Sequence, residues 1–210
     1  MDNQQAYNAW SATYDAVENK TRDLEKRALR ESVSSDDTPE ILEIGCGTGK
    51  NTEFLQTFAK RLTGADFSAE MLARAKAKIN APQVEFRQLD LRETWDFGED
   101  SFDLIVCSLA LEHIENIDFV FAEAHRVLRS GGRFYIGELH PFKQYRGSKA
   151  RFEAATGGEF VLECFTHHVS EFFAAGKNNG FALKELEEWF DDDDKTQIPR
   201  LLTLVFENRK

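Results

Sequence analysis

Short apolar runs alternate with longer amphipathic stretches through the middle of this 210-residue chain. Runs of four to six apolar residues are typical of buried strands, and apolar positions three or four residues apart are typical of helices. Strands that alternate with helices form a parallel sheet with right-handed crossovers. The pattern predicts strands at 41–44, 61–66, 84–88, 102–107 and 133–138, and helices at about 50–60, at 71–76 behind an N-cap at Ser68, and at about 117–128.

The first 33 residues have a different character. Their apolar and aromatic side chains recur at rough helical spacing, and the mixed charges between them are typical of a solvated helix face. A linker composition follows at 32–39, rich in serine and aspartate and closed by a proline. We therefore expect two parts: an N-terminal helical cap over residues 1–35, acting as a lid, and a main domain over residues 36–210.

The last third of the chain departs from the strand–helix alternation. An irregular stretch is expected at 139–152 and a helix at about 169–178, followed by strands at 181–190 and about 201–207. The connection at 191–199 is too short for a crossover helix, so these two strands must be antiparallel neighbours. The whole pattern predicts an α/β, Rossmann-like fold, with seven mostly parallel strands, helices on both faces and an antiparallel C-terminal hairpin.

Charge and cysteine content restrict the partners and the compartment. The formal net charge of −11 argues against nucleic acid, whose binding depends on neutralising phosphates. Three scattered cysteines do not suggest a disulfide framework, and the N-terminus lacks the apolar core of a signal peptide. No apolar run reaches membrane length. We expect a cytoplasmic protein, a monomer or homodimer, without a membrane partner.

One motif stands at the end of the first predicted strand. Residues 43–49 read Glu-Ile-Gly-Cys-Gly-Thr-Gly, and glycines at alternate positions let a chain turn sharply while a ligand touches its backbone. The spacing does not fit the dinucleotide fingerprint, whose last glycine would fall at Lys50. It does not fit a phosphate loop either, because Asn51 stands where Ser or Thr is needed. A nucleotide-like ligand of another kind is indicated.

Acidic residues follow the next two strands, at Asp66 and Asp90. In an open parallel sheet the ligand lies beyond the carboxyl ends of the strands, where such an acid can accept both ribose hydroxyls. Each aspartate alone could be only a turn former or a helix cap. Behind the glycine motif, however, the two together favour a binding role.

With these residues in place, the chain resembles the class I S-adenosylmethionine-dependent methyltransferases, strongly over about 40–140 and more weakly outside. The resemblance implies S-adenosylmethionine as cofactor, ribose on Asp66, adenine near Asp90, and methionine near the end of the fourth strand. The stretch Leu109–Ile114 looks like the small-molecule branch related to biotin and quinone biosynthesis. The cofactor-binding residues that the resemblance implies are Glu43, Gly45, Cys46, Gly47, Gly49, Asp66, Phe67, Met71, Asp90, Leu91, Cys107 and Ser108.

The acceptor is less well defined. No Asn/Asp-Pro-Pro-aromatic run follows the fourth strand, which counts against adenine and amide nitrogens as acceptors. His113 and His140 stand at strand ends, and either could be a general base near neutral pH or merely orient loops. Acceptor contacts are expected from aromatic residues of the cap and from a locally basic segment that would recognise an anionic group: Tyr7, Trp10, Tyr14, Lys143 and Arg146.

The predicted function is methyl transfer to a small-molecule acceptor, either neutral or negatively charged. A protein or peptide acceptor, a cofactor-binding protein without turnover, and a dinucleotide-dependent oxidoreductase stay open as alternatives. Glu112, His113, Glu138 and His140 have no recognised metal-ligand spacing, so no metal is expected.

Overall fold

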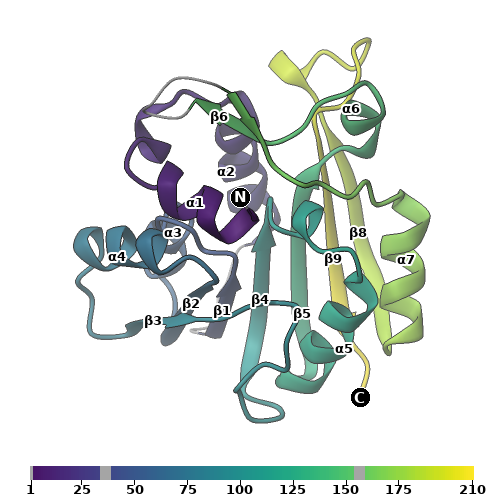
Figure 1. Cartoon of the computed structure of the whole chain (residues 1–210). Helices are drawn as coiled ribbons and strands as arrows, with labels where there is room; N and C mark the ends of the chain where they lie inside the picture. The colour runs from purple at the N-terminus through teal and green to yellow at the C-terminus, as the bar shows by residue number, and fades with distance from the viewer. Residues whose placement is uncertain (1, 34–38, 154–158) are drawn as a thin grey trace.

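A seven-stranded sheet forms the centre of the chain, which the computed structural model describes for residues 2–33, 39–153 and 159–210. The strand order is β3-β2-β1-β4-β5-β9-β8, and the first five are parallel to one another (Figure 1). Strand β9 is antiparallel to both of its neighbours, which confirms the predicted C-terminal hairpin. The strands are β1 (Glu40–Ile44), β2 (Arg61–Asp66), β3 (Val84–Gln88), β4 (Phe102–Ser108), β5 (Leu128–Leu139), β8 (Phe181–Trp189) and β9 (Leu201–Asn208).

Helices cover both faces of this sheet, as predicted. Apolar residues of α2 (Lys20–Ser32) and α3 (Thr52–Leu55) pack in a cluster on one face, whereas α5 (Ile117–Val127) and α7 (Val169–Asn178) pack in a separate cluster on the other. Helix α4 (Ala69–Lys78) lies at the β3 end of the sheet (Figure 1). None of the helices in the described ranges combines the length and apolarity needed to cross a lipid bilayer.

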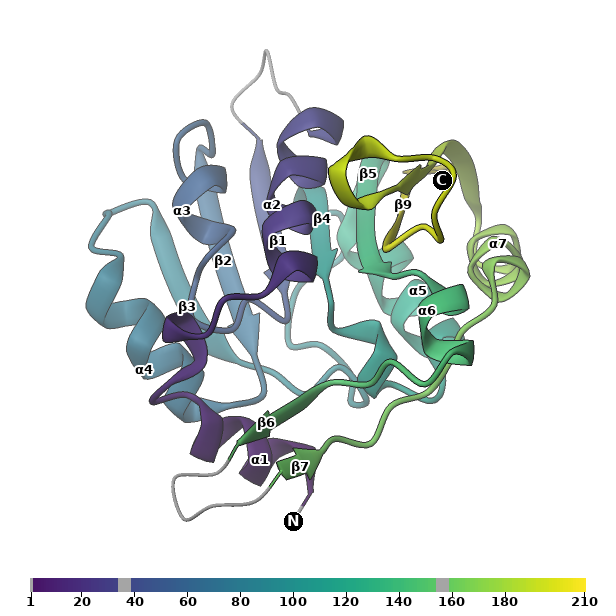
Figure 2. The same cartoon turned by 90° about the horizontal axis from the view of Figure 1, so that it is seen from above.

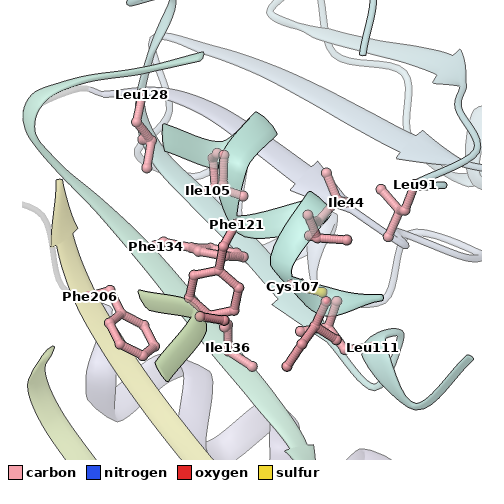
Figure 3. Packing of buried hydrophobic residues seen from close by; sticks show 14 of the residues in the cluster. Ile44, Leu91, Ile105, Cys107, Leu111, Phe121, Leu128, Phe134, Ile136 and Phe206 are labelled. Carbon is pink, nitrogen blue, oxygen red and sulfur yellow. The ribbon is translucent and has the colours of Figure 1, made fainter. Parts of the chain in front are cut away.

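Aromatic side chains fill the core on the α5 face. Phe121 of α5 meets Phe134 of β5 and Phe206 of β9 edge to face, with ring centroids 5.3 and 5.2 Å apart (Figure 3). This geometry suits the quadrupoles of the rings as well as burying apolar area. A tight core here fixes the carboxyl ends of β4 and β5, from which the loops described below emerge.

The N-terminal segment divides between core and cap. Helix α2 belongs to the main core, where Leu29 and Val33 pack against Tyr135 and Val205 of the sheet. Only α1 (Asn3–Trp10) and the short helix η1 (Tyr14–Ala16) lie beyond the carboxyl ends of the strands (Figure 2). The expected boundary at 35/36 and most of the linker at 32–39 lie outside the described residues.

Two predicted boundaries are wrong. The helix expected at 50–60 is only the four residues of α3, because Gln56 and Thr57 bond the carbonyls of the preceding turn and the backbone continues in tighter turns. The helix expected at about 117–128 agrees with α5, which ends at Val127. The strand expected at 133–138 begins earlier, at Leu128, because Leu128 is already extended, pairs with Phe102 and is fully buried.

The stretch expected to be irregular contains regular structure. Residues Pro141–Tyr145 form helix α6, with His140 as N-cap. Strand β6 (Arg151–Glu153) then pairs with β7 (Glu159–Val161) in a second, two-stranded sheet. In Figure 2 this small sheet lies beside α1, so the N-terminal helix and a segment far along the chain cover the same edge of the large sheet. Two further single turns complete the elements, η2 (Leu111–His113) and η3 (Asp191–Asp193).

Candidate active site

A cavity of about 220 Å³ lies where the carboxyl ends of β1, β2, β3 and β4 meet the underside of α1. Its wall combines the glycine turn after β1, the acids after β2 and β3, the loop after β4 and the polar face of α1. The lining residues are Asp2, Asn3, Gln4, Tyr7, Tyr14, Gly45, Gly47, Asp66, Phe67, Met71, Leu89, Asp90, Leu91, Arg92, Ser108, Leu109, Ala110, His113, Ile114 and Glu163.

The glycine turn requires glycine for two different reasons. Gly45 has φ +70°, and a Cβ built on it would lie 2.6 Å from the Cβ of Ala110, so the turn packs directly on the loop after β4. Gly47 has φ +53°, and a Cβ there would meet no atom within 4 Å. Gly47 therefore presents bare backbone to the cavity, and Gly45 holds the turn against its neighbour.

Asp66 joins the glycine turn to the start of α4. Its carboxylate accepts hydrogen bonds from the backbone N–H of Gly47 at 2.9 Å and of Ser68 at 2.8 Å. The side chain is only 7% exposed, and this burial raises the pKa of its carboxyl to about 6, against the opposing effect of the two N–H donors. Its position at the cavity wall leaves the carboxylate oxygens able to accept further hydrogen bonds.

Asp90 occupies the corresponding place after β3. Arg92 folds back onto its carboxylate through both Nε and Nη2, and this hydrogen-bonded pair lowers the pKa of Asp90. Apolar side chains of Phe67, Met71 and Leu89 line the same part of the cavity. The arrangement offers a flat ring an apolar slot with a polar edge.

The loop after β4 is fixed by a buried glutamate. Glu138 of β5 accepts hydrogen bonds from the backbone N–H groups of Ala110 and Leu111, at 2.9 and 2.8 Å. Its burial raises the pKa of this carboxyl to about 8. Leu109, one residue earlier, has φ +53°, a conformation that non-glycine residues adopt only when their surroundings impose it. The strained turn at Leu109 carries the chain from the strand into the cavity wall.

A tyrosine–histidine pair spans the cavity. The Tyr7 hydroxyl lies 2.8 Å from Nε2 of His113, and Nδ1 of His113 lies 2.9 Å from the carbonyl oxygen of Glu163. A carbonyl can only accept, so Nδ1 carries the proton and Nε2 accepts from Tyr7. Burial raises the pKa of Tyr7 well above its ordinary value, which keeps its hydroxyl a donor. The cavity wall therefore contains a phenolic oxygen that is hydrogen-bonded to a basic ring nitrogen.

Polar contacts hold α1 over the cavity. Asp2 caps the helix by accepting from the Gln5 N–H. The amide of Gln4 donates to the Phe67 carbonyl at 2.6 Å, and Asn3 exchanges two hydrogen bonds with the backbone of Glu163, at 3.0 and 3.1 Å. Apolar packing adds to these bonds, because Ala6 and Trp10 of α1 are buried against Leu162, and the Tyr7 ring contacts that of Phe67.

A second cavity, of about 190 Å³, adjoins the first. Tyr7, Tyr14 and Leu109 line both. The remaining wall comes from α2, the stretch after α6 and the end of β5, and it is rich in cations. Its other lining residues are Trp10, Asn19, Thr21, Arg22, Glu112, Leu139, Ser148, Lys149, Ala150, Arg151 and Arg200.

Four predicted cofactor residues do not line either cavity. Cys107 is fully buried in the core of the α5 face (Figure 3). Glu43 is also buried; it accepts a hydrogen bond from Thr52, and its burial raises the pKa of the carboxyl to about 8. A Cβ on Gly49 would meet Ile79 of the chain beside α4, and Cys46 lies behind the turn against Gly64. These residues shape the glycine turn from behind.

Three predicted acceptor or catalytic residues also lie elsewhere. His140 caps α6 by accepting from the Phe142 N–H, and its Nε2 lies 3.1 Å from Glu188. Lys143 and Arg146 belong to α6 and its end, and line neither cavity. Tyr7 and Tyr14 line both cavities as expected, whereas Trp10 lines only the second. The basic residues that do reach the second cavity come from other segments.

The structure brings together a different set of potential metal ligands from the four residues considered in the sequence. Glu112, His113 and Cys164 place ligand atoms within 4.8 Å of one another. Both ring nitrogens of His113 already have hydrogen-bond partners, however, and burial raises the pKa of the Cys164 thiol to about 11. The cluster is therefore explained by hydrogen bonding around His113.

Several lining residues had no signal in the sequence. Asn3 and Glu163 come together across 160 positions, and Arg22 reaches the second cavity from a helix that the charge pattern assigned to solvent. Arg92 could have been found, since an arginine two residues after a strand-terminal aspartate can fold back onto it. His167 also has a local function: it donates toward the carbonyls of Leu111 and Ile114.

Comparisons with known proteins agree on one chemistry. A family model described as a methyltransferase domain matches residues 42–136. The chain is 33% identical over 172 residues to a phosphatidylethanolamine N-methyltransferase of Cereibacter sphaeroides, covering 77% of this chain and 83% of that one. It is 28% identical to a ubiquinone biosynthesis O-methyltransferase of Dechloromonas aromatica, covering 63% of this chain and 57% of the relative.

Solved structures share the fold. An S-adenosylmethionine dependent methyltransferase from Mesorhizobium loti superimposes with a TM-score of 0.75 at 24% identity, covering 88% of this chain and 98% of that chain. The structure of DhpI in complex with SAH superimposes with a TM-score of 0.77 at 22% identity, covering 98% of this chain and 95% of that chain.

Proposed function

The chain belongs to the class I S-adenosylmethionine-dependent methyltransferases, and we propose that it methylates a hydroxyl or amine of a small-molecule acceptor that carries an anionic group. The observation that carries the proposal is the hydrogen bond between Tyr7 and His113 at the wall of the main cavity. It supplies a proton acceptor for a bound nucleophile within reach of the glycine turn.

The residues of the main cavity fit the cofactor. The bare backbone at Gly47 leaves open space where a side chain would stand, and Asp66 beside it suits the two hydroxyls of a ribose. Asp90 and the apolar slot of Phe67, Met71 and Leu89 suit an adenine ring. When bound at these residues, S-adenosylmethionine would supply the methyl group, and S-adenosylhomocysteine would be the product.

The protein must align the acceptor's nucleophile with the methyl group and remove its proton. Holding the nucleophile in line supplies much of the rate of such a displacement. We infer that the acceptor's proton passes to the Tyr7 oxygen while the Tyr7 proton moves to Nε2 of His113, which becomes imidazolium. The Glu163 carbonyl, accepting from Nδ1, then stabilises that cation and keeps the ring oriented.

A small acceptor fits better than a protein side chain. Helix α1 covers the main cavity, and its contacts with Phe67 and Glu163 would have to open for a folded polypeptide to enter. The relatives named above are an N-methyltransferase and an O-methyltransferase, which supports a nitrogen or oxygen nucleophile.

Three free cysteines, two of them buried, favour a reducing cytoplasm.

The test measures cofactor turnover and cofactor binding in the same variants. Tyr7→Phe and His113→Asn are expected to bind S-adenosylhomocysteine within about threefold of the unchanged protein. With labelled S-adenosylmethionine and a metabolite extract, both should form the product at least about a hundredfold more slowly, which is within the range of general-base effects. Full turnover in both variants would refute the base assignment.

The same assay separates the alternatives. Label that appears only in macromolecules would favour a protein acceptor. Binding of S-adenosylhomocysteine without turnover on any metabolite would favour a non-catalytic cofactor-binding protein. Thermal stabilisation by NAD(P) but not by S-adenosylhomocysteine would contradict the choice of cofactor.

A further inference from the structure

A buried arginine without a carboxylate partner lines the second cavity. Arg22 is only 8% exposed. Its Nη1 and Nη2 each donate at 2.7 Å to a backbone carbonyl, of Tyr14 and of Val17, and its Nε has no hydrogen-bond partner. The guanidinium lies over the Tyr14 ring, 4.2 Å from its centroid. Its hydrogen bonds thus go only to neutral groups, and the carboxylates of Asp15 and Asp23 act on it without a direct ion pair. A buried charge without a directly paired partner is expensive.

The carboxylates nearest in sequence are engaged elsewhere. Asp15 bonds Lys78 and Thr48, and Asp23 pairs with Lys50. No described carboxylate lies within ion-pair distance of Arg22. The positive charge is therefore available to a ligand that enters the cavity.

Further cations stand around the same cavity. Lys149, an exposed lysine of the stretch after α6, has no ion-pair partner among the residues that the structure describes. Arg200 lines the cavity too, but it already pairs with Asp191. Arg22 and Lys149 thus leave two positive charges in the wall of one cavity, in a chain whose formal net charge is −11.

The lining of the second cavity also includes one carboxylate, Glu112. Glu112 lies 3.9 Å from Nε2 of His113 and accepts from Gln144. Tyr7 and Leu109 are shared with the cofactor cavity. A ligand in the second cavity can therefore reach Tyr7, whose hydroxyl bonds His113, while an anionic group of the same ligand contacts the cations of the wall.

We propose that the second cavity binds the phosphate monoester group of the methyl acceptor between Arg22 and Lys149. The inference rests on the proposed function, which it extends by naming the anionic group and its site. Two unpaired cations match the nearly double charge of a monoester near neutral pH, and planar guanidinium donors suit phosphate oxygens. A carboxylate or a phosphodiester carries one charge and would leave one cation uncompensated.

The experiment uses inorganic phosphate as the probe and the full chain saturated with S-adenosylhomocysteine. Isothermal titration at pH 7.5 and constant ionic strength is expected to give a saturable, one-site isotherm. Lys149→Gln and Arg22→Gln should each weaken binding at least about tenfold, because each removes a charge-assisted hydrogen bond. Lys143→Gln is the matched control: the same charge is lost on α6, outside both cavities, and binding should stay within about twofold.

Lys149→Gln keeps the test valid if Arg22→Gln fails to fold, since Lys149 is exposed. Acetate and dimethyl phosphate test the ligand class, and each is expected to bind at least about tenfold more weakly than phosphate. Tighter binding of either would overturn the monoester assignment in favour of a carboxylate or of a diester such as a lipid headgroup. If Lys143→Gln weakens phosphate binding as much as the other two variants, the effect comes from general surface charge, and the proposed site is wrong.

The two proposals fail separately. If phosphate does not bind but Tyr7→Phe and His113→Asn abolish turnover, the phosphate site is wrong and the proposed function stands. If phosphate binds as expected but those variants keep full turnover, the base assignment is wrong and the site stands. Displacement of S-adenosylhomocysteine by phosphate would put the anion in the cofactor cavity and overturn the inference.

Discussion

Replacing Gly45 by alanine tests how the cofactor turn is built. Two separate penalties are expected. The residue has φ +70°, where an L side chain is strained, and the added Cβ would lie 2.6 Å from the Cβ of Ala110. The Ala110 Cβ is attached directly to backbone that Glu138 holds through its N–H, so the neighbour cannot move away by rotating a side chain.

The magnitude follows from these two terms. A left-handed backbone conformation costs an L residue roughly 1–2 kcal/mol. Forcing extra volume into a packed region costs about 1–3 kcal/mol more. The free energy of unfolding of Gly45→Ala should therefore fall by roughly 2–5 kcal/mol, a large fraction of the stability of an ordinary domain.

Two other glycines serve as matched controls. Gly131 has φ +76° and Gly47 has φ +53°, and a Cβ at either would meet nothing within 4 Å. Both alanine variants should lose only the conformational term of roughly 1–2 kcal/mol. Gly47→Ala, however, puts a methyl group into the cavity and should weaken cofactor binding at least about tenfold, whereas Gly131→Ala should bind normally because Gly131 is remote from the cavity.

Urea denaturation of the ligand-free proteins gives the stabilities, and calorimetric titration with S-adenosylhomocysteine gives the affinities. The decisive quantity is the difference between Gly45→Ala and Gly131→Ala. If the two lose equal stability, the contact with Ala110 is not tight and the account of the turn is wrong. If Gly47→Ala binds normally, its backbone does not face the cofactor.

Three further predictions concern titratable groups. Burial raises the pKa of Asp66 to about 6, so titration with S-adenosylhomocysteine should show affinity falling about tenfold from pH 7 to pH 5 as the carboxylate is protonated, and Asp66→Asn should remove this dependence. Burial raises the pKa values of Glu43 and Glu138 to about 8, against 4.5 unperturbed, so between these values the folded state binds more protons than the unfolded state. The urea midpoint should therefore fall as the pH rises from about 5 to 8. Glu43→Gln should make the dependence of this midpoint on pH weaker. His140→Asn should leave kcat within about twofold in the turnover assay, because the ring lies outside both cavities; a hundredfold loss would return it to the catalytic residues.

The cofactor half of the site could be predicted because its signals are local. Gly45, Gly47, Asp66 and Asp90 each follow a strand directly, and parallel strands bring their carboxyl ends to one edge. The parallel arrangement of the first five strands follows from the same alternation of strand and helix. For Cys107 the resemblance implies a backbone contact, and its side chain lies in the core because the side chains of a strand alternate between faces.

The cations of the second cavity could not be predicted, because contacts between distant segments bring them together. Composition pointed to Lys143 and Arg146, yet a hydrogen-bonded helix turn at 141–145 carries them away from both cavities. Arg22 was assigned to solvent from its charged neighbours, whereas Tyr14 and the turn at Val17 bury it. No local pattern encodes either outcome.

The two hydrogen bonds between Asn3 and the backbone of Glu163 have a consequence for how this enzyme could diversify. The strand ends of the seven-stranded sheet carry the residues proposed to bind the cofactor, whereas helix α1 and the segment around β7 bring Tyr7 and the partner of His113. Exchanging these two segments for those of another enzyme could alter the acceptor while leaving the sheet intact. They meet across the cavity, however, so a chimera should work only when both come from the same parent.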